Sequence, residues 1–286
     1  MKSIRELREY QYDYHSRLYP YVNDWRKCPY TFLKARFYME ASAVLVYLLL
    51  RTRVTPNAVT VTYALTGIVG AVLIGSGLPG CVVAGAMIYF IKGVLDWSDG
   101  HLARITGRTS ASGAVLDPYA SSLGGVVLQM ALGAYSYSRT GNIMFLYLLP
   151  LIPLFTLGRI HLFAYSELFK NMNSESQIRA FLCRDKKEDA PFRGMADGGG
   201  MAARGYSLLN RVLDNRARTV DLICLLLVFE QVSRYSIVCL VFAGFLVKDV
   251  LLFLCSLYAV LKGDWVGSSL RDKYGEVFET YERIKK

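Results

Sequence analysis

The sequence predicts an all-α polytopic membrane protein with six transmembrane helices and an N-terminal amphipathic helix. Of its 286 residues, 53% are hydrophobic and only 20% are charged, and the mean hydropathy is +0.28. A soluble domain of this length carries more charge and shorter apolar runs. Six apolar stretches each approach the roughly 20 residues that a helix needs to cross a bilayer.

These stretches lie at about 57–78, 79–98, 113–136, 141–164, 217–232 and 235–261. The first follows Thr55 and Pro56, a capping hydroxyl and a first-turn proline that together indicate a helix start. The fifth is short and is interrupted by Glu230. Lys248 and Asp249 fall in the middle of the sixth, where a buried charge requires a counterpart, so we expect a structural or interface pair there.

A shorter apolar run at 41–50 follows the charged residues Lys34, Arg36 and Glu40. Because this run is too short to cross a bilayer, residues 31–50 are predicted to form an amphipathic helix at the membrane surface. The expected organisation is therefore an N-terminal arm at 1–52 and a membrane domain at 53–264 that contains a loop at about 165–216. A tail at 265–286 completes it.

Lysine and arginine concentrate in residues 1–36, in the loop at 165–216 and in the tail. The positive-inside rule therefore predicts a multi-pass protein with both termini on the cytoplasmic side. The net charge of +10 is spread over these segments, which favours contact with anionic lipid headgroups and gives no reason to expect nucleic acid. No cleaved signal peptide is expected, because no n-region, apolar core and cleavage site open the chain.

Three carboxylates in the stretch 96–121 are predicted to form the functional site, on the cytoplasmic side. Asp96 and Asp99 share one helix face, and Asp117 follows eighteen residues later. Acidic groups at membrane depth are costly and commonly mark functional sites. If one helix ends after Arg104 and the next begins near Gly113, the carboxylates face one another. Clustered carboxylates suit Mg²⁺, and a diphosphate substrate would complete its coordination shell.

Other residues near the aspartates point to phosphate binding. Gly100 and Gly113 would allow the backbone to approach a ligand closely. Arg104 and Arg108 would neutralise phosphate oxygens. Lys92, one turn before the first aspartate, would contact a diphosphate or pair with a carboxylate.

Arg159 and His161 lie at the end of the fourth apolar stretch. They would bind the polar or phosphate group of an acceptor, or simply anchor the helix at the interface, and neither reading is favoured.

The acidic stretch closely resembles the signature of the CDP-alcohol phosphotransferase family: D-x-x-D-G-x-x-A-R, eight residues, G, three residues, D, three residues, D. Seven of its eight fixed positions match, namely Asp96, Asp99, Gly100, Ala103, Arg104, Gly113 and Asp117. The resemblance implies transfer of a substituted phosphate group from a CDP-linked alcohol to a hydroxyl acceptor, with release of CMP, in phospholipid synthesis. It also implies that one of the two substrates is a lipid and that the protein is a homodimer.

The same resemblance implies a role for each matching residue. Asp96, Asp99 and Asp117 would hold Mg²⁺ or Mn²⁺ on the CDP diphosphate. The CDP-binding residues would be these aspartates together with Asn57, Thr60, Gly100, Ala103, Arg104 and Gly113. The motif is shared by enzymes that act on lipid donors and on lipid acceptors, so it does not choose between them. The basic Arg159 slightly favours an anionic acceptor.

Position 121 departs from the signature, because Ser121 stands where the family has an aspartate that acts as base and metal contact. General base catalysis typically contributes roughly 10²–10⁴-fold, and a serine hydroxyl does not supply it near neutral pH. Three explanations stay open. In the first, the serine is an introduced substitution. In the second, the enzyme uses another base, for which His101 is the nearest candidate. Otherwise the protein binds CDP without turnover.

Overall fold

The computed structural model describes residues 3–18, 25–26, 29–157, 217–233 and 235–262. Every regular element in this part of the chain is a helix, which confirms the all-α prediction. The chain divides into two compact units. The first comprises residues 1–149 and 215–242, and the second comprises residues 150–214 and 243–286.

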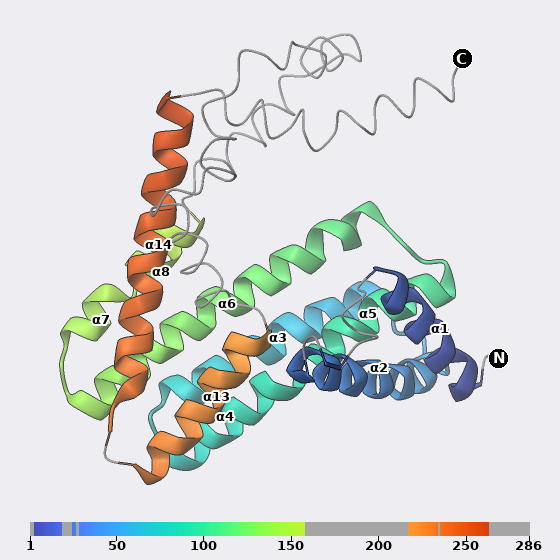
Figure 1. Ribbon diagram of the computed structural model, residues 1–286, viewed down its shortest axis with the longest axis horizontal. Coiled ribbons are helices and arrows are strands. Elements are labelled where there is room, and N and C mark those ends of the chain that lie inside the picture. The colour runs from blue at the N-terminus through green and yellow to red at the C-terminus, as the bar shows by residue number, and fades with distance from the viewer. Residues whose placement is uncertain (1–2, 19–24, 27–28, 158–216, 234, 263–286) are drawn as a thin grey trace. The chain divides into compact units, whose positions relative to one another are not determined.

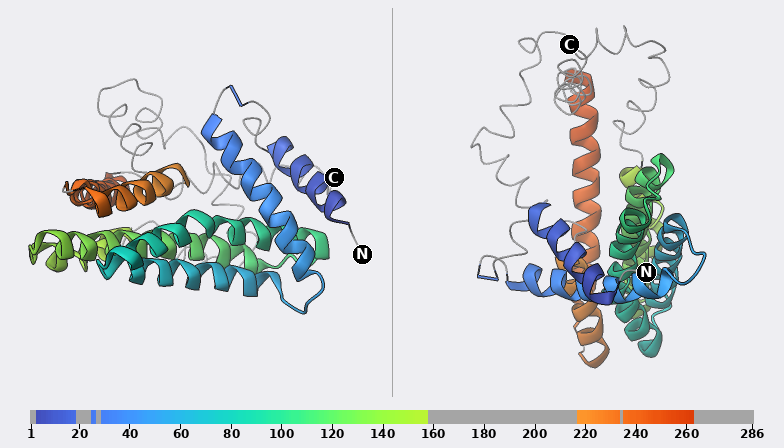
Figure 2. Two further views of the ribbon diagram at one scale, coloured as in Figure 1. Left: turned by 90° about the horizontal axis from the view of Figure 1, so that it is seen from below. Right: turned by 90° about the vertical axis from the view of Figure 1, so that its right-hand side faces the viewer.

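The first unit is a helical bundle (Figures 1 and 2). Its helices are α1 (Ile4–Leu18), α2 (Pro29–Leu49), α3 (Pro56–Gly75), α4 (Pro79–Ile91), α5 (Gly93–Thr106), α6 (Ala111–Thr140), α7 (Met144–Leu148) and α13 (Ala217–Val232), together with the first residues of α14 (Ile237–Lys262). Helix α3 packs against α4, α5 and α6. Helix α2 packs against α5 and α1, while α13 packs against α4.

Three stretches of the described chain are long and apolar enough to cross a membrane: Pro56–Gly75, Pro79–Thr106 and Ile237–Leu254. The protein is therefore a membrane protein, while the count of six spans stays a prediction. The second stretch combines α4 with α5, which meet at Lys92, so the predicted span at 79–98 runs eight residues further. That extension places the whole motif from Asp96 to Arg104 on one helix.

The predicted span at 141–164 is interrupted in the structure. Gly141 ends α6 with a positive φ of 68°, a conformation that favours glycine. Pro150, which has no amide donor, then separates α7 from α8 (Leu151–Leu157). Residues beyond 157 in this predicted span lie outside the described part of the chain.

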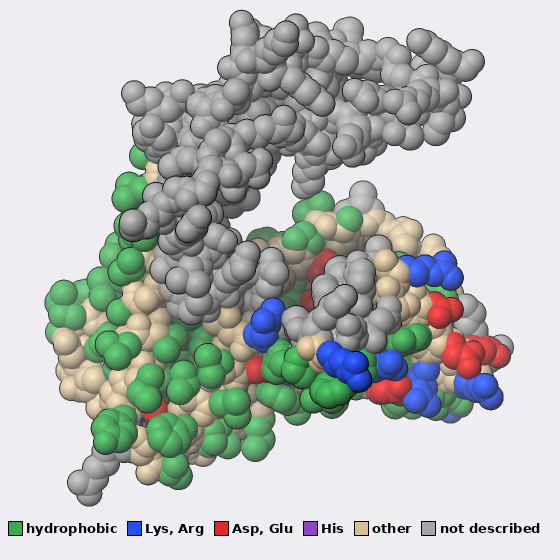
Figure 3. All heavy atoms as spheres, in the orientation of Figure 1, with side chains coloured by type: hydrophobic (Ala, Val, Ile, Leu, Met, Phe, Trp, Pro, Cys, Tyr) green, Lys and Arg blue, Asp and Glu red, His purple; other side chains and the backbone are tan. Residues whose placement is uncertain are grey.

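The predicted helix at 31–50 is present as α2, and its position at the membrane surface stays a prediction. Its buried face carries Ala35, Met39 and Ala43 among other residues, and its exposed face carries Leu33 and Phe37. Charged side chains gather over α1 and α2 on the face shown in Figure 3, whereas the surface over α4 and α13 is mainly hydrophobic. An apolar surface of this kind suits contact with lipid.

Helix α1 was not predicted from the sequence, although its first residues form a recognisable helix start. The hydroxyl of Ser3 accepts a hydrogen bond from the amide of Glu6 at 3.2 Å, and the Glu6 carboxylate accepts one from the amide of Ser3 at 3.1 Å. This reciprocal pair is a capping box. The helix is fixed by Leu7 and Gln11, both fully buried, and the Gln11 amide donates to the Ser42 hydroxyl of α2 at 3.2 Å.

Glu230, which interrupts the fifth apolar stretch, is fully buried and ties three helices together. Its carboxylate accepts hydrogen bonds from the Tyr135 hydroxyl of α6 at 3.1 Å and from the Val238 amide at the start of α14 at 2.6 Å. Gln231 donates to the same Tyr135 hydroxyl at 3.0 Å. A charge that weakens the hydropathy signal of α13 therefore has a structural role.

In the second unit, the described residues belong to α8 and the remainder of α14. The Phe155 and Phe253 rings pack edge to face, with centroids 5.3 Å apart. The Thr156 hydroxyl donates to the buried Asp249 carboxylate at 3.1 Å, and the Lys248 ammonium lies over the Phe245 ring. These contacts give each of the two charged residues a partner within the unit, and the structural or interface role expected for the pair at 248–249 stays a prediction.

Candidate active site

A tight turn at 107–110 brings the two halves of the motif together. Gly107 adopts a positive φ of 66°, and the Arg108 amide donates to the Ala103 carbonyl at 3.0 Å, which closes α5 with a Schellman motif. Ser110 then caps α6, because its hydroxyl accepts the amide of Gly113 at 3.0 Å. The turn therefore lies between the carboxylates of α5 and that of α6.

The three aspartates interact with one another electrostatically. Asp96 feels the charges of both Asp99 and Asp117, with Lys92 as its nearby cation. Asp99 is buried, while Asp117 is exposed at the start of α6. Within the described residues, no three acidic, histidine or cysteine side chains converge closely enough to hold a metal ion. The donor chemistry nevertheless fits Mg²⁺, since mutually repelling carboxylates offer the hard oxygen ligands that this cation prefers.

Asp99 is held by α3 as well as by its own helix. The Thr60 hydroxyl donates to Oδ2 of Asp99 at 2.5 Å, and the Gly100 amide donates to Oδ1 at 2.5 Å. Thr60 is 4% exposed, so this contact is shielded from water. Hydrogen bonds to an ionised carboxylate are among the stronger ones in proteins. Two residues predicted to bind CDP are therefore fixed to each other.

Gly113 lets α6 approach α3. A Cβ atom at this position would lie 3.0 Å from Oδ1 of Asn57 and 3.2 Å from the Ser110 hydroxyl. Asn57, in the first turn of α3, therefore lies beside the first turn of α6, as expected if both contribute to one nucleotide site. In the structure, Gly113 allows two helices to approach closely, whereas the sequence predicted a close approach of the backbone to a ligand.

Gly100 makes room for Arg104. A Cβ atom at position 100 would lie 3.0 Å from Nη1 of Arg104. The guanidinium lies over the Tyr14 ring, 3.9 Å from its centroid, and Nη2 donates to Oε1 of Gln11 at 3.4 Å. Its electrostatic interaction with Asp99 links it to the carboxylates. Arg104 therefore connects the motif to α1, in addition to any contact with phosphate.

His101 faces the N-terminal helix. It is fully buried, and its ring stacks on Tyr10 with an interplanar angle of 6°. This position argues against the role of replacement base that the sequence suggested. A second histidine belongs to the same interface: His15 stacks on Trp97 with ring centroids 4.2 Å apart. Burial, with a smaller effect from the charge of Arg104, lowers the pKa of His15 to about 4.

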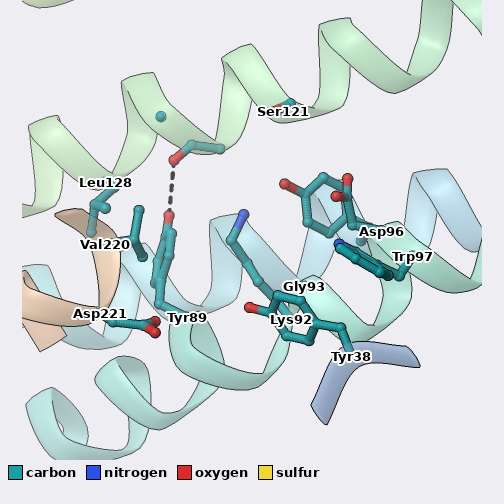
Figure 4. Close-up of a pocket in the computed structure, with 13 residues that line it drawn as sticks. Tyr38, Tyr89, Lys92, Gly93, Asp96, Trp97, Ser121, Leu128, Val220 and Asp221 are labelled. Carbon is teal, nitrogen blue, oxygen red and sulfur yellow. Dashed lines mark hydrogen bonds between the residues drawn. The ribbon is translucent and has the colours of Figure 1, made fainter. Parts of the chain in front are cut away.

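Ser121 lines a cavity of about 300 Å³ (Figure 4). Its side chain is exposed. The cavity is lined by Tyr38, Tyr63, Tyr89, Lys92, Gly93, Asp96, Trp97, Ser121, Gly124, Gly125, Leu128, Val220 and Asp221. Asp96 is the motif carboxylate that faces this space, so the cavity adjoins the predicted metal site.

Not every candidate residue is placed beside the aspartates. Arg108 is exposed in the turn that follows α5, while Ala103 and Arg104 lie on α5 itself. Arg159 and His161 lie outside the described residues.

An ion pair beside the cavity was not predicted from the sequence. The Lys34 ammonium of α2 lies 2.7 Å from Oδ2 of Asp221 on α13, and both side chains are more than 90% buried. The Tyr30 hydroxyl also donates to Asp221. An acidic residue inside an apolar stretch is itself a signal of function or of a buried pair, so Asp221 was identifiable from the sequence.

Comparison with known proteins supports the interpretation of the motif. Residues 53–176 match the family model described as CDP-alcohol phosphatidyltransferase. This range contains Asn57, Thr60, the three aspartates and Ser121, whereas α1, α2 and α13 lie outside it. A search of curated proteins gave no match.

Proposed function

Because residues 53–176 are a CDP-alcohol phosphatidyltransferase domain, we propose that this membrane protein transfers a substituted phosphate group from a CDP-linked alcohol to a hydroxyl acceptor. The family comprises transferases of phospholipid synthesis that use a divalent metal. In the proposed reaction, the acceptor oxygen forms a bond to the phosphorus that bears the alcohol. The bond from that phosphorus to the bridging oxygen breaks, CMP leaves, and the acceptor hydroxyl gives up its proton.

The observation that carries this proposal is the hydrogen bond between Thr60 and Asp99. It joins the first turns of α3 to the motif helix, at the place where Asn57 and Gly113 also bring α3 and α6 together. Residues that the resemblance to the family assigns to one nucleotide site are therefore neighbours in space, although they are far apart in the chain.

In this proposal, Asp96, Asp99 and Asp117 hold Mg²⁺, or Mn²⁺, against the diphosphate of the donor. The metal would offset the negative charge of the phosphates and acidify a bound hydroxyl. Asn57, Thr60, Gly100, Ala103 and Gly113 would surround the cytidine nucleotide. Arg104 would hold the motif helix against α1 while its charge acts on the phosphates.

We further propose six transmembrane spans, with the active site and both termini on the cytoplasmic side, and a homodimeric assembly. The basic segments at 1–36 and 265–286 support this orientation through the positive-inside rule. The homodimer rests on resemblance to the family alone.

The alternative is a CDP-binding membrane protein without turnover, and Ser121 is the observation that favours it. Measurement of CMP release from a panel of CDP-alcohols with Mg²⁺ separates the two. We expect Ser121→Asp to release CMP about 10²–10⁴-fold faster than the unaltered sequence. The double variant Ser121→Asp, Asp99→Asn serves as the control and should lose this gain.

Two results decide between the candidates. Turnover by the unaltered sequence removes the silent-protein alternative. If Ser121→Asp binds CDP but releases no CMP with any donor and acceptor tested, the transferase proposal fails.

A further inference from the structure

Lys92 places an ammonium group in the cavity without a close carboxylate. Its Nζ atom lies 4.2 Å from the centroid of the Tyr63 ring and 4.9 Å from that of Tyr89. Asp96 attracts it from one helical turn away. In the described part of the chain, however, no carboxylate oxygen lies within 4.0 Å of this ammonium. Ring faces stabilise a cation but leave its charge available to an anion.

The second lysine near the cavity shows the contrasting arrangement. The Lys34 ammonium is 2.7 Å from the Asp221 carboxylate and donates to the Phe90 carbonyl at 3.1 Å. Its charge is thus neutralised within the protein, as is usual for buried ions. Lys92 therefore differs from Lys34 in having a charge directed at an open space.

Two glycines let the Lys92 ammonium extend between α3 and α6. A Cβ atom at Gly124 would lie 2.8 Å from Nζ, and one at Gly67 would lie 3.5 Å from it. The Tyr89 hydroxyl donates to the Gly124 carbonyl at 3.1 Å and so fixes the ring beside the lysine. Figure 4 shows the Lys92 side chain reaching toward α6, between Tyr89 and Asp96.

We propose that this cavity binds the acceptor, and that Lys92 selects an acceptor alcohol that carries a phosphate or carboxylate group. The inference rests on the proposed transferase function. Asp96 and Ser121, where the reaction would occur, line the cavity, and its volume of about 300 Å³ suits a small polar molecule. Lys92 and Asp96 are one helical turn apart, about 6 Å along the axis. An alcohol whose anionic group and hydroxyl are separated by a short carbon chain spans that distance.

The lining supports an assignment to the acceptor. Tyr38, Val220 and Asp221 come from α2 and α13, which lie outside the matched residues 53–176. The predicted CDP residues Asn57, Thr60 and Gly113 do not line the cavity. The donor site and this cavity therefore share Asp96 but are otherwise built from different residues. The lysine could also bind the diphosphate of the donor, so the test must distinguish the anionic group of the acceptor from the donor diphosphate.

The test uses the full chain in lipid nanodiscs with Mg²⁺, and measures binding by calorimetry. The probes are glycerol 3-phosphate and glycerol, which differ only in the phosphate, and CDP reports on the donor site. We expect Lys92→Met to weaken glycerol 3-phosphate binding about tenfold or more, since a hydrogen bond to a charged group contributes about 1.5–3 kcal/mol. Binding of CDP and of glycerol should stay as in the unaltered protein.

Two further variants keep the result interpretable. Gly124→Ala retains the lysine but displaces its ammonium, and should weaken glycerol 3-phosphate binding to a smaller extent. Arg139→Gln removes a positive charge at the opposite end of α6 and should change nothing. If Lys92→Met does not fold, as judged by thermal unfolding, Gly124→Ala decides the question.

The proposal is overturned if glycerol 3-phosphate binds no more tightly than glycerol. It is also overturned if Lys92→Met, or Gly124→Ala in its place, leaves glycerol 3-phosphate binding unchanged. Weaker CDP binding in Lys92→Met would assign the lysine to the donor diphosphate instead. Binding of glycerol 3-phosphate is also measured without CDP. If the unaltered protein does not bind CDP, the transferase function is therefore contradicted independently of the result for Lys92.

Discussion

At the scale of single residues, the motif is shaped by contacts between protein groups before any ligand binds. Asp99 is oriented by a hydroxyl and an amide, and Gly100 and Gly113 leave space for Arg104 and Asn57. The identity of three motif residues, Asp99, Gly100 and Gly113, therefore has a steric or hydrogen-bonding reason. It explains why the uncharged positions 100 and 113 of the motif are glycines.

Replacement of Thr60 by valine tests the support of Asp99. The change keeps the shape of the side chain but removes the donor to a buried carboxylate, so we expect CDP binding with Mg²⁺ to weaken about tenfold or more. Calorimetry on the full chain measures this. Thr62→Val is the matched control, because the Thr62 hydroxyl donates only to the Ala58 carbonyl of its own helix at 2.8 Å. Equal binding by the two variants would show that the Thr60 contact does not organise the site.

At the scale of elements, α1 is held on the motif helix by aromatic rings and by Arg104. His15 sits in this interface with its pKa lowered to about 4, chiefly by burial. When α1 detaches, the pKa returns toward its usual value near 6.5. The detached state therefore binds more protons below that pH, so the contribution of His15 to docking is fully present above pH 6.5 and is lost as the pH falls toward 4.

Limited proteolysis of α1 at pH 7 and at pH 5 measures this loss. We expect faster cleavage within residues 4–18 at pH 5. His15→Phe keeps an aromatic ring against Trp97 but does not titrate, so its cleavage should depend less on pH. An unchanged pH dependence in that variant would place the titrating group elsewhere.

Glu230 gives a second prediction at this scale, because it joins α6, α13 and α14. Glu230→Leu leaves the Tyr135 hydroxyl and the Val238 amide without their acceptor, and an unsatisfied buried group costs about 1–3 kcal/mol. We expect the melting temperature to fall by several degrees. Glu230→Gln retains an acceptor oxygen and should lose less. A smaller loss for leucine than for glutamine would contradict the structural role of the carboxylate.

At the scale of the whole molecule, the helices and the motif could be predicted from local sequence patterns, whereas the contacts between residues far apart in the chain could not. The apolar runs and the Thr55-Pro56 start marked α3, and the spacing from Asp96 to Asp117 marked the motif. The contacts of Lys34 with Asp221 and of Arg104 with Gln11 join residues 187 and 93 positions apart. The hydrophobic periodicity of a sequence does not predict such pairs, because they depend on how separate helices pack against one another.

The orientation in the membrane is the remaining prediction at this scale, and α6 provides its test. This helix has 30 residues and is therefore about 45 Å long, which exceeds the roughly 30 Å hydrocarbon core. If α6 crosses the bilayer, the turns at 107–110 and 141–143 lie on opposite sides. With the native cysteines replaced by alanine, we expect Arg108→Cys to react with a membrane-impermeant maleimide only from the cytoplasmic side. Asn142→Cys should react only from the other side. Reaction of both from one side would contradict a spanning α6, and the reversed pattern would contradict the orientation that the basic segments predict.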